Sequence, residues 1–437
     1  MREMKDSGIE WIGEIPKDWS LKKGRYLFVQ RNDRGNDENL QLLSPSQKFG
    51  VIPQSLLEDL TTQTTVKLKE NTDLSTLKTV HKGDFCISLR SFQGGFEYSE
   101  YEGVVSPAYQ IFYKKEDLVN TYYKYIFKDS SFISKMNSYT MSLRDGKNIS
   151  YFDFGNTYLP LPTVCEQQQI ADYLDTQCSE IDATAEDIQK EISLLEDYKK
   201  SVITEAVTKG LNPDAEMKDS GIEWIGQIPK HWKVVRLEFL SWVRARLGWK
   251  GLKADEYVDE GYPFLSAFNI QDSKIKWEPL NFITKERFDE SPEIMVACGD
   301  VLLLKDGAGV GKCARIDSLP KGDSTVNSSL AVITCFDNLN YRYLYYSFNS
   351  SFFSNLINLK LNGMGVPHLT QEELRKFIVL LPCVKEQQQI ADFLDTKCSE
   401  IDAIIADKKR QRGILAEYKK SLIYEYVTGK KEVPINE

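Results

Sequence analysis

The stretch "LPTVCEQQQIADYLDTQCSEIDA" (Leu161–Ala183) occurs a second time, 220 residues later, as "LPCVKEQQQIADFLDTKCSEIDA" (Leu381–Ala403). In each copy a proline precedes a glutamate and three glutamines, a pattern that favours the start of a helix. The apolar residues that follow are spaced alternately four and three residues apart, which is typical of an amphipathic helix. The sequence therefore predicts two long helices, one within 159–210 and one within 378–437, the second followed by a C-terminal tail.

The apolar spacing forms a heptad seam in both copies. Its members are Leu174, Cys178, Ile181, Ile188 and Leu195 in the first copy and Leu394, Cys398, Ile401, Ile405 and Leu415 in the second. Lys408 and Arg412 fall in the middle of the second seam. One helix cannot bury such a stripe by itself, so we predict an intramolecular coiled coil. The helices are expected to be antiparallel because a whole block of sequence folds between them. Two helices that each pack on their own domain remain the alternative.

A second phrase is also repeated: "MKDSGIEWIGEIPKDW" (Met4–Trp19) returns as "MKDSGIEWIGQIPKHW" (Met217–Trp232). Its glycines permit turns and its prolines interrupt helices, so a simple turn-rich segment is one interpretation. Because each copy directly precedes a block of unrepeated sequence, we predict a strap that docks the block onto the helices or onto a partner protein. The predicted docking residues are the large apolar anchors Trp11, Trp19, Trp224 and Trp232.

The two unrepeated blocks, about 20–158 and 233–377, share an order of expected strands and helices although their amino-acid sequences differ. Each has a Gly-Asp pair before an apolar run, at Gly83 and at Gly299, which indicates a turn and then a strand. A further strand and aromatic-rich helices follow, and these helices are expected to lie in the core. We predict an α/β (α+β) fold with a pseudo-twofold internal repeat. The predicted boundaries are 1–158 for the first domain and its strap, 159–210 for the first helix, 211–377 for the second domain and its strap, and 378–437 for the second helix and tail.

The chain has 437 residues and a formal net charge of −9, but its acidic residues are unevenly distributed. Residues 20–158 hold 18 basic and 16 acidic side chains, and residues 233–377 hold 18 of each, so the excess acid lies in the repeated segments. Both blocks can therefore form local basic surfaces. Eight cysteines without a CxxC pair and three histidines favour neither a zinc site nor a disulfide framework. Without a long apolar run or a signal peptide, we expect a cytoplasmic protein with no membrane partner.

Taken together, the "EQQQIAD" helices, the "SGIEWIG" phrase before each block and the strands at "GD…VSPAYQ" and "GDVLLLKDGAGVGK" resemble the specificity subunit of type I restriction–modification systems. The resemblance covers essentially the whole chain. It implies that the blocks are target-recognition domains, each reading one half of a bipartite, asymmetric double-stranded DNA site, and that the helices are spacers. It also implies docking of two methyltransferase subunits and, in the complete enzyme, two restriction (motor) subunits. This chain is then not an enzyme and binds no cofactor or metal, and S-adenosylmethionine, ATP and Mg are expected on its partners.

Candidate DNA-binding residues are those in expected turns whose side chains suit bases and phosphates. In the first block they are Arg90, Ser91, Gln93, Arg144, Lys147 and Asn148. In the second block they are Arg246, Trp249, Lys250, Lys305, Lys312 and His368. The alternative for each of them is an ordinary solvated surface residue.

The sequence carries no recognisable methyltransferase, nuclease or helicase motif. The segment "DGAGVGKC" (Asp306–Cys313) resembles a phosphate-binding loop, but Asp306 and Cys313 stand where that motif requires Gly and Ser or Thr. A Gly-rich turn between strands is therefore expected. The alternative function is a coiled-coil adaptor that presents two protein-binding domains and does not bind DNA.

Overall fold

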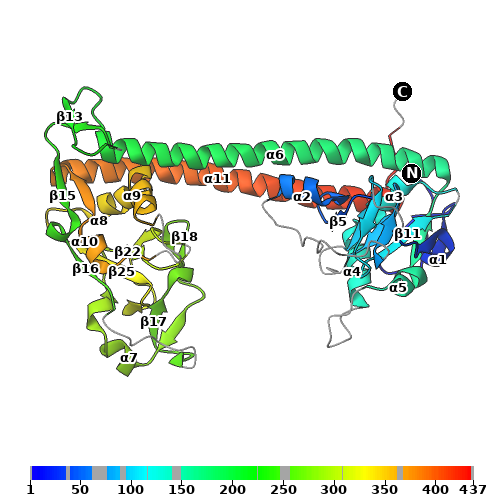
Figure 1. Cartoon of the computed structure of the whole chain (residues 1–437), viewed down its shortest axis with the longest axis horizontal. Coiled ribbons are helices and arrows are strands. Elements are labelled where there is room, and N and C mark those ends of the chain that lie inside the picture. The colour runs from blue at the N-terminus through cyan, green and yellow to red at the C-terminus, as the bar shows by residue number, and fades with distance from the viewer. Residues whose placement is uncertain are drawn as a thin grey trace. The chain divides into compact units, whose positions relative to one another are not determined.

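The chain divides into two compact units, of which unit 1 comprises Met1–Ile188 and Arg410–Glu437 and unit 2 comprises Gln189–Lys409. Each unit contains one α/β domain and a part of each long helix, α6 (Val164–Lys209) and α11 (Val384–Val427) (Figure 1). The prediction of two α/β domains with two long helices packed together is confirmed. The computed structural model describes residues 2–35, 40–61, 76–88, 95–115, 117–139, 149–223, 225–246, 256–307, 309–361 and 368–434.

Each unit is built around a four-stranded antiparallel sheet with the same strand order. In unit 1 the order is β4 (Phe28–Arg31), β11 (Gln110–Lys114), β8 (Phe85–Ile87) and β9 (Phe96–Tyr98). In unit 2 the order is β16 (Ser241–Arg244), β25 (Leu330–Cys335), β22 (Asp300–Leu304) and β23 (Cys313–Arg315). Two blocks with little common sequence therefore share one sheet topology.

Two-stranded antiparallel ribbons form where each domain begins and where its two ends meet. The straps form the hairpins β1 (Met4–Asp6) with β2 (Glu14–Pro16) and β13 (Met217–Asp219) with β14 (Gln227–Pro229). The strands after the straps pair with the strands before the long helices, β3 (Ser20–Lys23) with β12 (Tyr158–Leu161) and β15 (Lys233–Arg236) with β26 (Ile378–Leu381). The regions expected to be helical thus begin as strand, because Pro162 and Pro382 hold the preceding residue extended.

Further elements differ between the units. Unit 1 adds α1 (Gly24–Leu27), α2 (Gln54–Leu60), the pair β5 (Leu43–Ser46) with β6 (Gly50–Pro53), and the pair β7 (Lys78–Val80) with β10 (Gly103–Val105). Unit 2 adds α7 (Lys285–Asp289), the hairpin β18 (Ile270–Gln271) with β19 (Lys274–Ile275), and a second sheet of β20 (Asn281–Ile283), β17 (Tyr262–Leu265), β24 (Ser324–Val326) and β21 (Met295–Val296).

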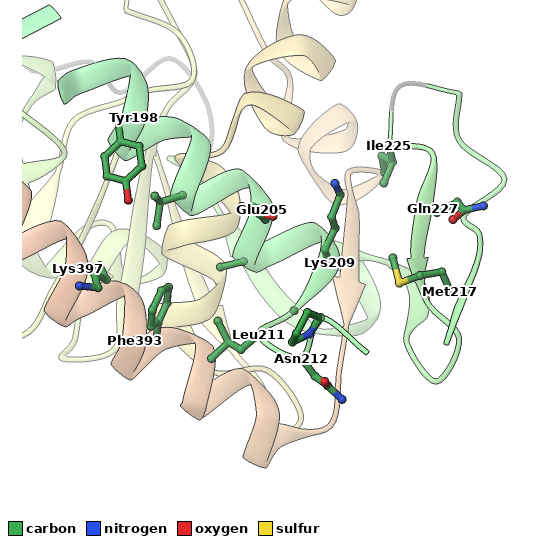
Figure 2. A pocket seen from close by; sticks show the side chains of 14 residues that line it. Tyr198, Glu205, Lys209, Leu211, Asn212, Met217, Ile225, Gln227, Phe393 and Lys397 are labelled. Carbon is green, nitrogen blue, oxygen red and sulfur yellow. The ribbon is translucent and has the colours of Figure 1, made fainter. Parts of the chain in front are cut away.

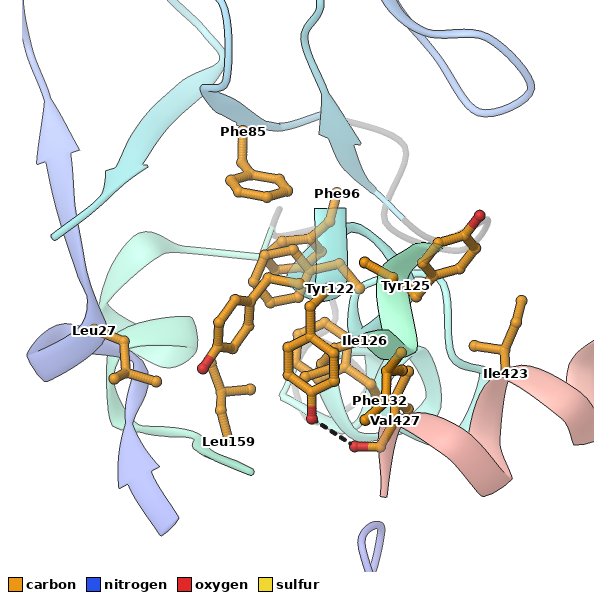
Figure 3. Close-up of a cluster of buried hydrophobic side chains, with 14 of the residues drawn as sticks. Leu27, Phe85, Phe96, Tyr122, Tyr125, Ile126, Phe132, Leu159, Ile423 and Val427 are labelled. Carbon is orange, nitrogen blue, oxygen red and sulfur yellow. Dashed lines mark hydrogen bonds between the residues drawn. The ribbon is translucent and has the colours of Figure 1, made fainter. Parts of the chain in front are cut away.

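Three helices follow the central strands in each unit. They are α3 (Asn120–Ile126), α4 (Ser130–Ser138) and α5 (Tyr151–Asn156) in unit 1 and α8 (Tyr341–Phe348), α9 (Ser351–Leu361) and α10 (Gln371–Arg375) in unit 2. The predicted place of α3, α4, α8 and α9 in the core is confirmed, since Tyr122, Phe132, Tyr343 and Phe353 are buried. Figure 3 shows the aromatic cluster of unit 1, in which the Tyr122 hydroxyl donates to the Val427 carbonyl at the end of α11 over 2.8 Å.

The Gly-Asp pair does the same structural work in both domains. Asp84 accepts the backbone N–H of His81 and lies 2.7 Å from Arg31 Nε on the outer strand β4. Asp300 accepts the N–H of Ala297 and lies 3.0 Å from Arg244 Nη2 on the outer strand β16. The aspartate thus closes the turn before the central strand and pairs with an arginine that is half-buried in unit 1 and buried in unit 2, which explains why the pair recurs.

The long helices run antiparallel within each unit. In unit 1 Lys419 Nζ lies 2.6 Å from Asp182 Oδ2. In unit 2 Lys199 Nζ lies 2.6 Å from Asp402 Oδ1, and Lys408 Nζ lies 2.5 Å from Glu191 Oε2. Higher numbers on one helix pair with lower numbers on the other. Lys408 is half-buried, so its stem can cover the seam while its ammonium reaches a carboxylate.

The seam residues are covered to different degrees. Leu174, Cys178, Ile188, Leu394, Cys398, Ile401 and Ile405 are buried, whereas Ile181, Leu195 and Leu415 are half-buried. The helix ends also enter the domain cores: Leu174 and Val427 belong to the core of unit 1, and Leu394 and Val207 to that of unit 2. Each core therefore uses the start of one long helix and the end of the other. Across the described part of the chain, no helix is both long and apolar enough to cross a membrane.

Candidate functional site

The strand register of unit 2 brings several of the predicted binding residues to one end of the central sheet. Arg244 on β16 is opposite Val332, Leu304 on β22 is opposite Leu330, and Leu303 is opposite Cys313. The end of β16, the start of β25, the end of β22 and the start of β23 therefore meet at one place. We call this place the sheet end of unit 2. It comprises Arg246, the described turn residues 305–307 and 309–312, Ser329 and His368.

An aspartate links two of the predicted residues at this sheet end. Lys305 Nζ lies 2.8 Å from Asp306 Oδ2, and His368 Nδ1 contacts Asp306 Oδ1. The Lys305 side chain is only 13% exposed, so its charge is largely satisfied within the protein, whereas His368 is 49% exposed. The Lys305 backbone bonds to Ser329 and Leu369, which fixes the turn to β25 and to the segment that carries His368. Sequence reasoning did not single out Asp306, because its role depends on this pairing.

The Gly-rich turn is a tight connection between strands. Leu304 N–H donates to the Lys312 carbonyl, and Gly311 N–H donates to the Leu304 carbonyl. Gly311 has φ +92°, and a Cβ on it would lie 2.4 Å from Ile357 of α9. Glycine is therefore favoured here by its positive φ, and the turn packs closely against the terminal methyl of Ile357 on a core helix. Lys312, at the end of the turn, is exposed to solvent.

Arg246 carries hydrogen-bond donors with no partner in the described structure. Its Nε and Nη2 atoms are buried and make no hydrogen bond there. Burial and the nearby Arg287 guanidinium lower its pKa, and Glu290, Glu293 and Glu256 act in the opposite direction. Unsatisfied buried donors are costly, so this guanidinium is suited to an incoming acceptor. Trp249 and Lys250, predicted beside it, lie outside the described residues.

The sheet end of unit 1 has the same topology. The connection from β8 to β9 passes through the predicted residues Arg90, Ser91 and Gln93, which lie outside the described residues. Arg144, Lys147 and Asn148 lie outside them as well. The segment after these three returns to the sheet end, because Gln110 at the start of β11 donates to the Ile149 carbonyl over 3.3 Å and accepts the Tyr151 N–H over 2.7 Å. Gln110 was not predicted, although a polar residue at the first position of an apolar strand is a usable signal.

A family model described as "Type I restriction modification DNA specificity domain" matches residues 15–194 and 229–411. The chain belongs to this family of DNA specificity subunits. The MjaVIII specificity subunit of Methanocaldococcus jannaschii is 27% identical over 302 residues, which cover 68% of each chain. The putative MjaX specificity subunit of the same organism is 24% identical and covers 97% of this chain and 96% of its own. A solved chain described under "Structural basis underlying complex assembly and conformational transition of the type I R-M system" has a TM-score of 0.70 at 15% identity, over 95% of this chain and 99% of that one, and shares the fold.

As a specificity subunit, the chain is a non-catalytic part of a type I restriction–modification complex. The predicted function of DNA recognition is confirmed at this level, and the adaptor that does not bind DNA is set aside. Among the described residues, no group of His, Cys, Asp and Glu side chains could hold a metal ion.

The straps of the specificity subunit hold their tryptophans against the long helices. Trp19 Nε1 donates to Glu166 Oε1 at the start of α6 over 3.3 Å, and Trp232 Nε1 donates to Glu386 Oε1 at the start of α11 over 3.0 Å. Both rings are buried. Trp11 is also buried, with its ring edge-on to Phe132 at 5.4 Å. Trp224 lies outside the described residues.

The first glutamine of each "EQQQ" sequence ties a core helix to a long helix. Gln167 accepts the Val119 N–H before α3 over 2.9 Å. Gln387 accepts the Asn340 N–H before α8 over 2.7 Å. Both glutamines are completely buried and also donate to the carbonyl of the preceding proline, Pro162 or Pro382. The repeated letters therefore encode equivalent attachments of the two domains.

Proposed function

We propose that each domain reads one half of a bipartite, asymmetric double-stranded DNA site through its sheet end. The long helices and straps hold two methyltransferase subunits and, in the complete assembly, two restriction subunits. The observation that carries the proposal is the strand register of unit 2, which gathers Arg246, Lys312 and His368 at one end of a rigid sheet. Residues from four strands and one later segment can then act on one ligand.

The chemistry at the sheet end of unit 2 suits DNA. Arginine is the common partner of guanine in the major groove, and Arg246 offers donors that lack a partner among the described residues. The exposed Lys312 suits a phosphate oxygen, which positions the protein without reading sequence. Lys305 is assigned a structural role, because its ammonium group forms an ion pair with Asp306.

The two half-sites differ because the residues at the two sheet ends differ. The turn between β22 and β23 is Gly-rich, whereas the connection between β8 and β9 has the sequence "SLRSFQGG" (88–95). A common scaffold with unlike turns supports an asymmetric site. Arg90, Ser91, Gln93, Arg144, Lys147 and Asn148 remain candidates for the first half-site, and Trp249 and Lys250 for the second.

The catalytic cofactors belong to the partners in this proposal. S-adenosylmethionine is bound by the methyltransferase subunits, and ATP and Mg by the restriction subunits. The net charge of −9 suggests that the partners also supply much of the phosphate-binding charge. The isolated chain is then expected to bind DNA weakly, and the complex to bind it tightly and in a salt-sensitive way.

A domain exchange tests the proposal. Residues 20–158 are replaced by the corresponding block of another specificity subunit, and the methylated sequences of the host genome are determined by single-molecule sequencing. One half-site is expected to change while the other stays the same. Exchange of residues 233–377 is the matched control and should change the opposite half. Changes in both half-sites with either exchange would contradict independent reading by the two domains.

A further inference from the structure

A groove of about 850 Å³ lies in unit 2 between the end of α6, the strap and the start of α11 (Figure 2). Its lining includes Ala206 and the side chains of Tyr198, Leu211 and Phe393. Tyr198 is 57% exposed, Leu211 42% and Phe393 37%. The part of the chain that the structure describes therefore leaves apolar surface uncovered in this groove.

The internal repeat indicates what fills the same place in unit 1. A shift of 220 residues makes Tyr426 the counterpart of Ala206 and Tyr173 the counterpart of Phe393. The rings of Tyr426 and Tyr173 pack with centroids 4.6 Å apart, and Tyr426 is only 5% exposed. An aromatic ring of the chain itself thus occupies in unit 1 the space that Ala206 leaves open in unit 2.

The strap is also held differently in the two units. In unit 1 the Tyr424 hydroxyl and Lys430 Nζ both donate to the Ile12 carbonyl, over 3.2 and 2.7 Å. Their counterparts in unit 2 are Thr204 and Gly210. The Thr204 hydroxyl accepts the Ser351 N–H instead, and glycine has no side chain. Ile12 is completely buried, whereas its counterpart Ile225 in the groove wall is partly exposed.

We propose that the groove binds an aromatic side chain of a partner protein, accompanied by a hydroxyl or ammonium group that donates to the Ile225 carbonyl. This inference rests on the proposed function, because it takes the partner to be a methyltransferase subunit. The occupant is inferred from the side chains that unit 1 supplies from its own chain, which are two tyrosines and a lysine.

The consequence is that the two methyltransferase subunits do not dock equivalently. The straps and the "EQQQ" attachments repeat in both units, but Tyr426 fills in unit 1 the position that Ala206 leaves open in unit 2. The subunit that docks at unit 2 gains contacts which unit 1 cannot offer. A buried aromatic anchor in a pocket is the kind of contact that dominates a protein interface.

The variant Ala206→Tyr tests the groove by filling it as Tyr426 fills its counterpart. Assembly of the full-length chain with the methyltransferase subunit is followed without DNA by native mass spectrometry and by titration. One of the two binding events is expected to weaken by about tenfold or more, so that complexes with a single methyltransferase accumulate. The matched control, Ala206→Ser, leaves the groove open and should bind both subunits normally. Normal binding of both subunits by Ala206→Tyr would overturn the proposal.

A second experiment does not depend on how Ala206→Tyr folds. Leu211 is replaced by the photo-reactive residue p-benzoylphenylalanine, and the assembled complex is irradiated. An adduct on a methyltransferase peptide that contains an aromatic residue supports the proposal, and adducts confined to this chain or to a restriction subunit refute it. DNA reading is scored separately by the domain exchange, so failure of the groove and failure of the proposed function give different results.

Discussion

Trp232 and Glu386 join the strap of unit 2 to the first turn of α11, with the indole Nε1 3.0 Å from the carboxylate Oε1. Trp19 and Glu166 repeat the arrangement in unit 1. In each unit, the tryptophan of the strap thus donates a hydrogen bond to the glutamate of the "EQQQ" sequence. This pairing explains why both phrases recur together, because a domain attached to a helix through one of them needs the other.

Trp232→Phe is expected to destabilise unit 2 by about 1.5 kcal/mol, since it removes a hydrogen bond to a charged acceptor but keeps an aromatic ring. Hydrogen exchange of unit 2 peptides in the full-length chain measures the effect. Trp242→Phe is the control, because Trp242 is 53% exposed and should tolerate the change. Equal protection in both variants would show that the Trp232 bond contributes little.

Arg2→Ala is expected to make unit 1 less resistant to acid. Burial opposes the ionisation of Glu166, but hydrogen bonds from Arg2 and Trp19 outweigh it and hold its pKa below the ordinary value of 4.5. A carboxyl with a lowered folded pKa stabilises the fold above its unfolded pKa, and this stabilisation is lost as the pH falls through the folded pKa. Removing Arg2 raises the folded pKa, so the acid unfolding midpoint should move to higher pH. Lys17→Ala, which removes the exposed pair with Glu3, should leave that midpoint unchanged.

Asp300→Ala is expected to destabilise unit 2 by about 3–5 kcal/mol, because it leaves the buried Arg244 charge without its partner. The side chains of Asp300 and Arg244 are 1% and 8% exposed. Urea unfolding, followed by the protection of peptides from β22 and β25, provides the measurement. Asp289→Ala breaks an exposed pair with Lys285 and should cost less than about 0.5 kcal/mol. Similar losses in the two variants would mean that burial of the Arg244 pair is not what matters.

Lys312→Ala is expected to weaken DNA binding by the assembled complex to a similar degree for all sequences. One lost phosphate contact should also lower the slope of log Kobs against log salt concentration by about 0.9. Fluorescence anisotropy over a salt series provides both quantities. Lys321→Ala serves as the control. Lys321 lies in the loop before β24, where it pairs with Glu278, and its replacement should leave the slope unchanged. A change in sequence preference without a change in slope would assign Lys312 to base reading.

Much of the architecture could be predicted because it is written as repeats and periodic patterns. The heptad seam predicted two long helices, and Leu174 and Leu394 are both buried at their starts. The Gly-Asp pairs predicted turns before strands, and Asp84 and Asp300 close those turns. Such patterns are local, so they are visible before any contact between distant residues is known.

The candidate site was less predictable at the level of single residues. Lys305 matched the composition of a phosphate contact, but Asp306 and the distant His368 decide how its charge is used. Gln110 was recognised as part of the sheet end only in the structure, where the segment after residue 148 returns to β11 and bonds to it. Composition identifies which side chains suit DNA, whereas the neighbours of each side chain come from strand register.

The amino-acid order alone established the duplication, the helices, the shared order of elements and the resemblance to a DNA specificity subunit. The partners of individual side chains were decided by folding, as in the contact of Tyr122 with Val427, which lie 305 residues apart. The same holds for Ala206 and Tyr426, which are equivalent in the repeat: Ala206 lines an open groove, whereas the Tyr426 ring packs on Tyr173. The reason is physical: propensity and periodicity act over a few residues, whereas burial and hydrogen bonding depend on which distant segments the whole chain brings together.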